Sequence, residues 1–157
     1  MKRIILCAAV VAGFLASCQS NKSTEEKIDS LATSPDTSVT NVQSCYSYVN
    51  DRDTVSLSYI KAGNAIAGNL NYNLFQKDKN AGTVAGIIKG DTVIADYTFS
   101  SEGTTSYRQV VFLKKGDQLV EGYGPSQEVD GKSRFTDISK LKFGGQGTIV
   151  LSAIPCK

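Results

Sequence analysis

The chain of 157 residues contains no histidine. This absence excludes Ser-His-Asp and Cys-His catalysis, histidine general bases and histidine metal ligands. Carboxylate and Ser-Lys chemistry remain open in principle, but no spacing of residues supports either of them. We therefore predict that the protein is not an enzyme and that it binds no cofactor and no metal.

The sequence also lacks an excess of charge once its first residues are set aside. The full chain has 17 Lys+Arg and 15 Asp+Glu, and residues 1–17 hold two basic residues, Lys2 and Arg3, and no acidic one. Removing these two leaves 15 basic residues against 15 acidic ones. A neutral surface provides no long-range attraction to a phosphate backbone, so we predict no binding to nucleic acid.

The amino-terminal apolar run is too short for a transmembrane helix. Ile4–Leu15 follows the basic start Met1-Lys2-Arg3. About twelve residues reach only ~18 Å as a helix, against ~30 Å of hydrocarbon. A short apolar run after a basic start is typical of an export signal, so we expect residues 1–17 to be a signal peptide.

This run ends in Leu15-Ala16-Ser17-Cys18, which resembles the lipobox of bacterial lipoproteins. In that family a dedicated peptidase cuts before a cysteine that carries a diacylglycerol thioether. The resemblance implies fatty acylation of Cys18, for example with palmitate, and a membrane anchor. Gln19, rather than Asp, follows the cysteine, and the family's sorting rule then favours the outer membrane. Glu25-Glu26 is similar to signals for surface display, so both the periplasmic face and the cell surface are open.

Few cysteines are left for the mature protein. Of the four, Cys7 lies in the signal and Cys18 takes the lipid, which leaves Cys45 and Cys156. Two thiols in an oxidising compartment predict one disulfide. The alternative, a reactive or metal-binding pair, lacks partner ligands.

Composition divides the remaining chain into two parts. Residues 18–44 are rich in Ser, Thr, Asn, Lys and Glu, which predicts a lipidated flexible tether because little apolar surface can be buried. Residues 45–157 contain short runs of Val, Ile, Thr, Tyr and Phe separated by Gly, Asn and Asp, a pattern typical of antiparallel β-structure. We therefore predict a folded β-domain over 45–157.

Three similar turn signals, Gly63-Asn64, Gly90-Asp91 and Gly116-Asp117, predict three β-hairpins. A two-residue loop fixes which residues face each other, and in the first two hairpins it gathers the apolar residues on one face. The expected facing pairs are Tyr59–Gly68, Leu57–Leu70 and Val55–Tyr72 in the first hairpin, and Ile88–Val93, Gly86–Ala95 and Val84–Tyr97 in the second.

The two late cysteines favour a closed sheet. Cys45 precedes the first predicted strand (46–49) and Cys156 follows the last (149–154). The Cα atoms of a disulfide must lie within ~7 Å, which an up-and-down meander achieves when its strand number is even and the sheet closes. Six hairpin strands and an uncertain strand near 135–143 bring the count to eight or nine. We predict an all-β fold, an antiparallel up-and-down barrel of about eight strands, with a β-sandwich as the alternative.

The third hairpin places three charged residues, Arg108, Lys114 and Glu121, on its predicted inner face. Lys114 is near the turn, where it can reach water, so Arg108 and Glu121 are the two that need an explanation. We interpret them as polar anchors of a ligand cavity whose aromatic walls are Tyr72, Tyr97 and Tyr123. On this hypothesis Glu121→Gln abolishes the binding of a cationic or polar ligand. The alternative is an ion pair at the barrel mouth and tyrosines that pack in the core.

One short segment is similar to part of a calcium loop. Residues 78–82 place Asp78 and Asn80 ahead of Gly82, but the remaining oxygen ligands and the distal glutamate are lacking, and Lys77 and Lys79 add opposing charge. We predict a hairpin connection there rather than a metal site.

The overall layout is similar to that of the membrane-bound lysozyme inhibitors of Gram-negative envelopes. The likeness covers residues 15–157: a lipobox, a polar tether, a small β-domain and a disulfide that ends at Cys156. That family's Ser-Gly-x-x-Tyr loop has no counterpart, so no inhibitory residue can be transferred. The prediction is an envelope lipoprotein that acts as a non-catalytic binding or interaction module; the alternatives are an inhibitor of a hydrolase and a small-ligand-binding barrel.

Overall fold

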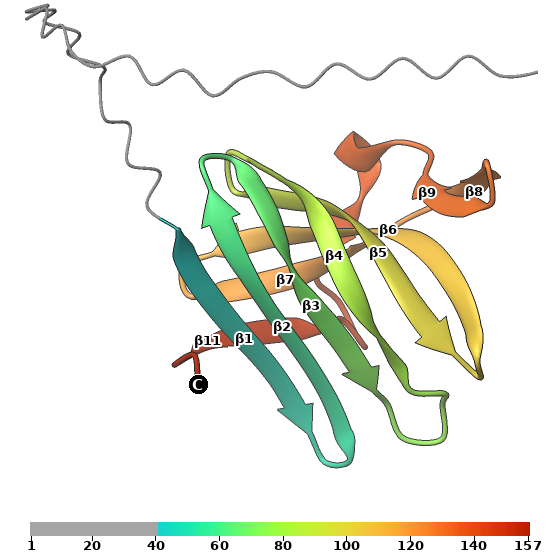
Figure 1. The fold of residues 1–157 in the computed structure, drawn as a ribbon, viewed down its shortest axis with the longest axis horizontal. Helices are drawn as coiled ribbons and strands as arrows, with labels where there is room; N and C mark the ends of the chain where they lie inside the picture. The colour runs from blue at the N-terminus through green and yellow to red at the C-terminus, as the bar shows by residue number, and fades with distance from the viewer. Residues whose placement is uncertain (1–40) are drawn as a thin grey trace, which may run out of the picture. The chain divides into compact units, whose positions relative to one another are not determined.

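Eight antiparallel strands close into a barrel in the computed structural model, which describes residues 41–157 (Figure 1). Consecutive strands pair from β1 to β7, and the last strand, β11, pairs with both β7 and β1 to complete the ring. The closed ring confirms the predicted barrel over the sandwich. Its strands are β1 (Val42–Asn50), β2 (Asp53–Ala62), β3 (Ala65–Asn73), β4 (Asn80–Lys89), β5 (Thr92–Ser101), β6 (Thr104–Lys115), β7 (Gln118–Tyr123) and β11 (Val150–Ile154).

The three predicted hairpin turns lie where the sequence signals place them. Gly63, Gly90 and Gly116 have φ values of 62°, 59° and 60°, which glycine adopts without steric cost. A glycine with positive φ at the first turn position suits the type II′ turns that join twisted strands. All six facing pairs expected for the first two hairpins occur in the structure, so the predicted register is confirmed.

Alternation along the strands places one set of side chains inside the barrel. Sixteen buried residues form the interior cluster, and Tyr97, Leu70, Leu119 and Leu151 have no exposed surface. The strands also approach closely, because a Cβ at Gly68 would overlap the carbonyl oxygen of Ser58 on β2. The interior is therefore mainly filled by side chains, and space is left only towards its ends.

The segment between β7 and β11 lies against the outside of the barrel. It comprises β8 (Ser126–Val129), β9 (Lys132–Phe135), the short 3-10 helix η1 (Ile138–Lys140) and β10 (Lys142–Phe143). β9 makes one parallel pairing with β6, and β10 pairs with β7. Outside the barrel interior, Val111, Val120 and Leu141 are buried as well.

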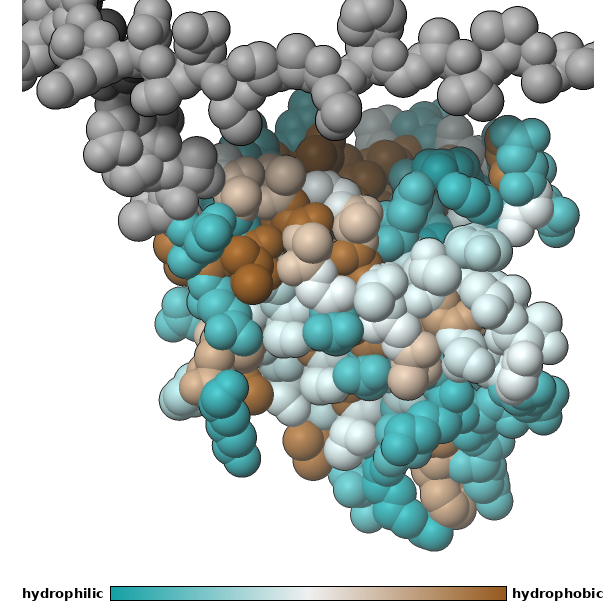
Figure 2. Space-filling model, viewed as in Figure 1, coloured by the Kyte–Doolittle hydropathy of each residue, from teal (hydrophilic) through white to brown (hydrophobic). Residues whose placement is uncertain are grey.

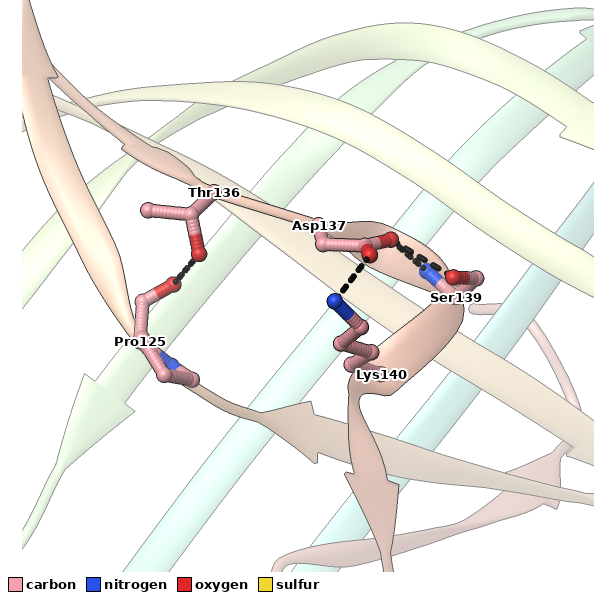
Figure 3. A network of polar contacts seen from close by, with 5 residues as sticks. All are labelled: Pro125, Thr136, Asp137, Ser139 and Lys140. Carbon is pink, nitrogen blue, oxygen red and sulfur yellow. Dashed lines mark hydrogen bonds and ion pairs between the residues drawn. The ribbon is translucent and has the colours of Figure 1, made fainter.

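The uncertain strand near 135–143 was therefore a wrong prediction. Asp137 caps η1 by accepting hydrogen bonds from the backbone N (2.9 Å) and the hydroxyl (2.6 Å) of Ser139, and it pairs with Lys140 at 3.2 Å (Figure 3). Both the N–H and the hydroxyl of Thr136 donate to the carbonyl of Pro125, which closes the base of the β8–β9 hairpin. These local bonds turn the chain before a barrel strand can form.

The predicted disulfide joins the first and last strands. Cys45 on β1 is bonded to Cys156, with their Cα atoms 5.3 Å apart. β1 begins at Val42, so the folded part starts three residues before the boundary expected at 45. The signal peptide, Cys18 and most of the predicted tether lie outside the described residues.

The two ends of the barrel differ. We call the end where β1 begins the disulfide end; it carries the Gly63, Gly90 and Gly116 turns, because Val42 faces Lys61 in the register. Figure 2 shows hydrophobic side chains gathered towards this end on an otherwise mostly hydrophilic or neutral face. The large hydrophobic residues exposed there include Val42, Ile60, Ile87 and Ile154. The opposite end carries the connection between β3 and β4 and holds the candidate site.

Candidate functional site

A cavity of about 360 Å³ opens at the end of the barrel opposite the disulfide. Its volume lies within the range of small-molecule sites, about 300–1,000 Å³. Strands β3, β4, β6 and β7 each contribute a side chain to it, and the loop after β3 contributes part of its rim. We call this site the polar mouth; its lining includes Tyr72, Lys77, Asn80, Arg108, Glu121 and Tyr123.

Glu121 is a buried carboxylic acid within the polar mouth. The residue is 7% exposed, and its two carboxyl oxygens accept hydrogen bonds from Tyr72 (2.8 Å) and Tyr123 (3.2 Å). Burial raises the pKa of Glu121 above 4.5, against the opposing effects of the Tyr72 hydrogen bond and the positive charge of Arg108. The site therefore holds an acidic group whose neutral form is favoured more than in water.

The three tyrosines of the site stay protonated at neutral pH. Burial raises the pKa of Tyr97 and of Tyr123 to about 12, and it raises the pKa of Tyr72 well above 10. Their hydroxyls are therefore hydrogen-bond donors throughout the physiological range. Tyr72 and Tyr123 use this capacity on Glu121, whereas the hydroxyl of Tyr97 is buried with no partner.

Arg108 reaches the polar mouth from β6 through an aromatic cluster. Its guanidinium carbon lies 4.8 Å from the ring centre of Tyr72, 5.4 Å from that of Tyr97 and 5.5 Å from that of Phe99. The three ion pairs formed within residues 41–157 join other side chains, so the ion pair considered as an alternative from the sequence is not made. Arg108 and Glu121 share a cavity without neutralising each other directly.

Unpartnered polar atoms are concentrated at this one site. Within residues 41–157, three buried side-chain atoms have no hydrogen-bond partner: Oδ1 of Asn80, the hydroxyl of Tyr97 and Nε of Arg108. Asn80 and Arg108 line the cavity, and Tyr97 faces Arg108 in the β5–β6 register. An unsatisfied buried polar group costs roughly 1–3 kcal/mol, and native proteins keep few of them.

The structure brings together all five residues that the sequence nominated. Tyr72, Arg108, Glu121 and Tyr123 line the cavity and Tyr97 packs behind it, although Tyr123 lies at the rim with 42% of its surface exposed. Sequence reasoning missed Phe99 and the role of Asn80. The signal for Phe99 was present, because it follows Tyr97 by two residues on a strand and so shares its inner face.

The calcium-like segment also meets the polar mouth. Asp78 and Asn80 contribute to its lining. Residues 78 and 79 lie in the predicted hairpin connection between β3 and β4, whereas residues 80–82 already belong to β4. Across residues 41–157, no group of three or more Cys, Asp or Glu side chains could hold a metal ion. Asn80 lines the polar mouth.

A neighbouring cavity of about 530 Å³ shares Lys77, Asp78 and Asn80 with the polar mouth. Two cavities elsewhere are less suited to recognition. One of about 690 Å³ lies on the outer wall near η1; among the charged groups that line it, Arg134 and Asp137 are already paired, and Lys89 is not. Another of about 330 Å³ lies at the disulfide end. Of the unpartnered atoms described above, none belongs to a residue that lines either cavity.

Comparison with protein-family models, with curated proteins and with solved structures found no match to this chain. Within residues 41–157, no helix has the length and apolar character needed to span a bilayer.

Proposed function

We propose that this protein is a non-catalytic binding module of a bacterial cell envelope that takes a small polar molecule into the polar mouth. One observation carries the proposal. Of the three buried polar atoms that lack partners, those on Asn80 and Arg108 belong to residues that line one cavity of about 360 Å³, and the third, on Tyr97, belongs to the residue that faces Arg108. A ligand with matching donors and acceptors would satisfy them.

The envelope location rests on the sequence and on the disulfide. The lipobox-like Leu15-Ala16-Ser17-Cys18 implies an acylated cysteine, and Gln19 favours the outer membrane over the inner one. The bond between Cys45 and Cys156 suits an oxidising compartment. Labelling cells with radioactive palmitate tests the anchor: label is expected on the wild-type chain and not on Cys18→Ser, and equal labelling of both would contradict the assignment.

Native mass spectrometry of the protein purified from its own cells tests the binding function. We expect a retained small molecule of constant mass that is released on denaturation. Asn80→Leu, which replaces a lining amide by an apolar group of similar size, should lose the adduct. Asn71→Leu is the matched control, because Asn71 lies on the outer face of β3 and bonds Ser56 instead.

The same measurement separates binding from a purely protein-directed role. A co-purifying protein without a small molecule would contradict the ligand proposal, since it would indicate an interaction through the loops. If Asn80→Leu and the wild type retain the small molecule equally, the ligand binds somewhere other than the polar mouth.

A further inference from the structure

Arg108 is a cation at the edge of the cavity with no anionic partner in residues 41–157. It takes part in none of the side-chain hydrogen bonds and ion pairs of that region, and its Nε is buried without an acceptor. A guanidinium stays protonated in proteins, so the charge persists at every physiological pH. A partly buried charge of this kind calls for a counter-charge.

Glu121 does not supply that counter-charge efficiently. It forms no ion pair with Arg108, and its two oxygens accept hydrogen bonds from Tyr72 and Tyr123 instead. Burial raises its pKa, against the lowering effects of these hydrogen bonds and of Arg108. Glu121 therefore acts as a positioning residue that orients Tyr72 and Tyr123. The sequence led us to expect that Glu121 anchors a cationic or polar ligand. The contacts of the two residues instead favour Arg108 as the anchor.

The surroundings of Arg108 favour recognition of an anion. Contacts with Tyr72, Tyr97 and Phe99 hold the guanidinium in place without using its N–H groups on oxygen. A held guanidinium presents a fork of donors that matches carboxylate and phosphate oxygens. Lys77 adds a second positive charge to the lining, opposed by Asp78.

The rest of the lining includes apolar surface. Leu74 and Ile149 line the same cavity as Arg108. A ligand that contacts both Arg108 and these two apolar residues has a charged head and an uncharged body.

We infer that the ligand of the polar mouth carries an anionic oxygen group, a carboxylate or a phosphate, which accepts hydrogen bonds from Arg108 while its apolar part contacts Leu74 and Ile149. This inference rests on the proposed binding function and adds the chemical class of the ligand. The side-chain oxygen of Asn80, which has no hydrogen-bond partner, then favours a ligand that also carries a hydrogen-bond donor.

Arginine side-chain NMR on the ¹⁵N-labelled full chain in detergent tests the inference. The Nε–H signals of Arg52, Arg108 and Arg134 are assigned by substituting each arginine in turn. Four compounds with one ring and different heads are titrated: benzoate, phenyl phosphate, benzylamine and benzyl alcohol. We expect benzoate or phenyl phosphate to shift the Arg108 signal saturably and to leave Arg52 unmoved; which of the two acts distinguishes carboxylate from phosphate.

Two variants give the matched comparison, with anion binding followed through the tyrosine ring signals. Arg108→Met should weaken binding of the effective anion by roughly tenfold or more, because hydrogen bonds to a charged group are lost. Arg52→Met should leave it unchanged, although Arg52 also stacks on an aromatic ring at the same end of the barrel, 3.6 Å from the centre of Phe75.

The outcomes separate this inference from the proposed function. If neither anion moves the Arg108 signal, or Arg108→Met binds them as well as the wild type, the anion assignment is overturned. A saturable response to benzylamine alone would overturn it too and would leave the polar mouth as a binding site. Failure of all four compounds, together with no molecule retained in native mass spectrometry, would contradict both.

Discussion

The hydroxyl of Tyr72 donates a 2.8 Å hydrogen bond to Oε1 of Glu121, and the two residues lie 49 positions apart in the chain. The bond runs from β3 to β7, two strands that are not neighbours in the sheet. It therefore spans the barrel interior and ties together opposite parts of the wall at the polar mouth.

This bond gives the first test, a comparison of two tyrosines. Tyr72→Phe leaves a buried carboxyl group with one donor fewer, so we expect a loss of about 1–3 kcal/mol in the free energy of unfolding. Tyr97→Phe removes a buried hydroxyl that has no partner, so its stability should stay within about 0.5 kcal/mol of the wild type or rise. Urea unfolding measures both; equal losses would contradict the assigned hydrogen bonding.

The raised pKa of Glu121 predicts a pH dependence of stability with a defined sign. Above pH 4.5 Glu121 keeps its proton in the folded chain but releases it in the unfolded chain. The contribution of Glu121 to the free energy of unfolding is therefore complete below pH 4.5 and is lost as the pH rises through its pKa in the folded chain. We expect the free energy of unfolding to fall as the pH rises from 4.5. Glu121→Gln cannot ionise and should give a flatter curve.

Glu128→Gln is the control for that experiment. Glu128 is an exposed glutamate on β8, so its substitution should leave the slope unchanged. Curves for the wild type and Glu121→Gln that run parallel from pH 4.5 upward would show that Glu121 has an ordinary pKa.

The disulfide gives a prediction about global stability. Cys45 and Cys156 are 111 residues apart, and cross-linking a loop of that length restricts the unfolded chain by about 4–5 kcal/mol in the chain-entropy account. The double variant Cys45→Ala/Cys156→Ala should therefore unfold at a markedly lower temperature. Reductant should lower the melting temperature of the wild type towards that of the double variant. It should not change the melting temperature of the double variant. If reductant changes neither melting temperature, the disulfide does not stabilise the fold.

Two glycines with different surroundings should respond differently to the same substitution. A Cβ at Gly68 would overlap backbone atoms of Ser58 and Tyr59, so Gly68→Ala should cost about 3 kcal/mol or more because strands must separate. At Gly63 a Cβ meets nothing within 4 Å, and only the positive φ is unfavourable, so Gly63→Ala should cost about 1–2 kcal/mol. Thermal unfolding ranks the two, and the reverse order would contradict the close strand packing.

Much of the barrel could be predicted because its turns and strand registers are determined by residues that are close together in the sequence. The Gly90-Asp91 signal fixes a turn, and the alternation of apolar residues around it then fixes the register between β4 and β5. The same reasoning placed Arg108 and Glu121 on the inner face. It could not supply the Tyr72–Glu121 bond, because that contact depends on how the closed barrel brings non-neighbouring strands together.

The hairpin on the outer wall shows where such reasoning fails. Asp130-Gly131 is a strong turn signal, with both φ values positive as a type I′ turn requires. All four residues of β8 are exposed, however, so the strand carries no apolar alternation. A strand that buries no face leaves no hydrophobic pattern in its sequence, which is why the segment from Ser126 to Phe135 gave no prediction of a hairpin.

The bond between Cys45 and Cys156 also determines how a mechanical load would pass through the molecule. It joins the first and last strands at the end of the barrel remote from Glu121. A pull on the chain ahead of Val42 would be transferred across the sulfur bridge to β11 within a few residues. The seam between these two strands would then bear the force, at a distance from the side chains around Arg108.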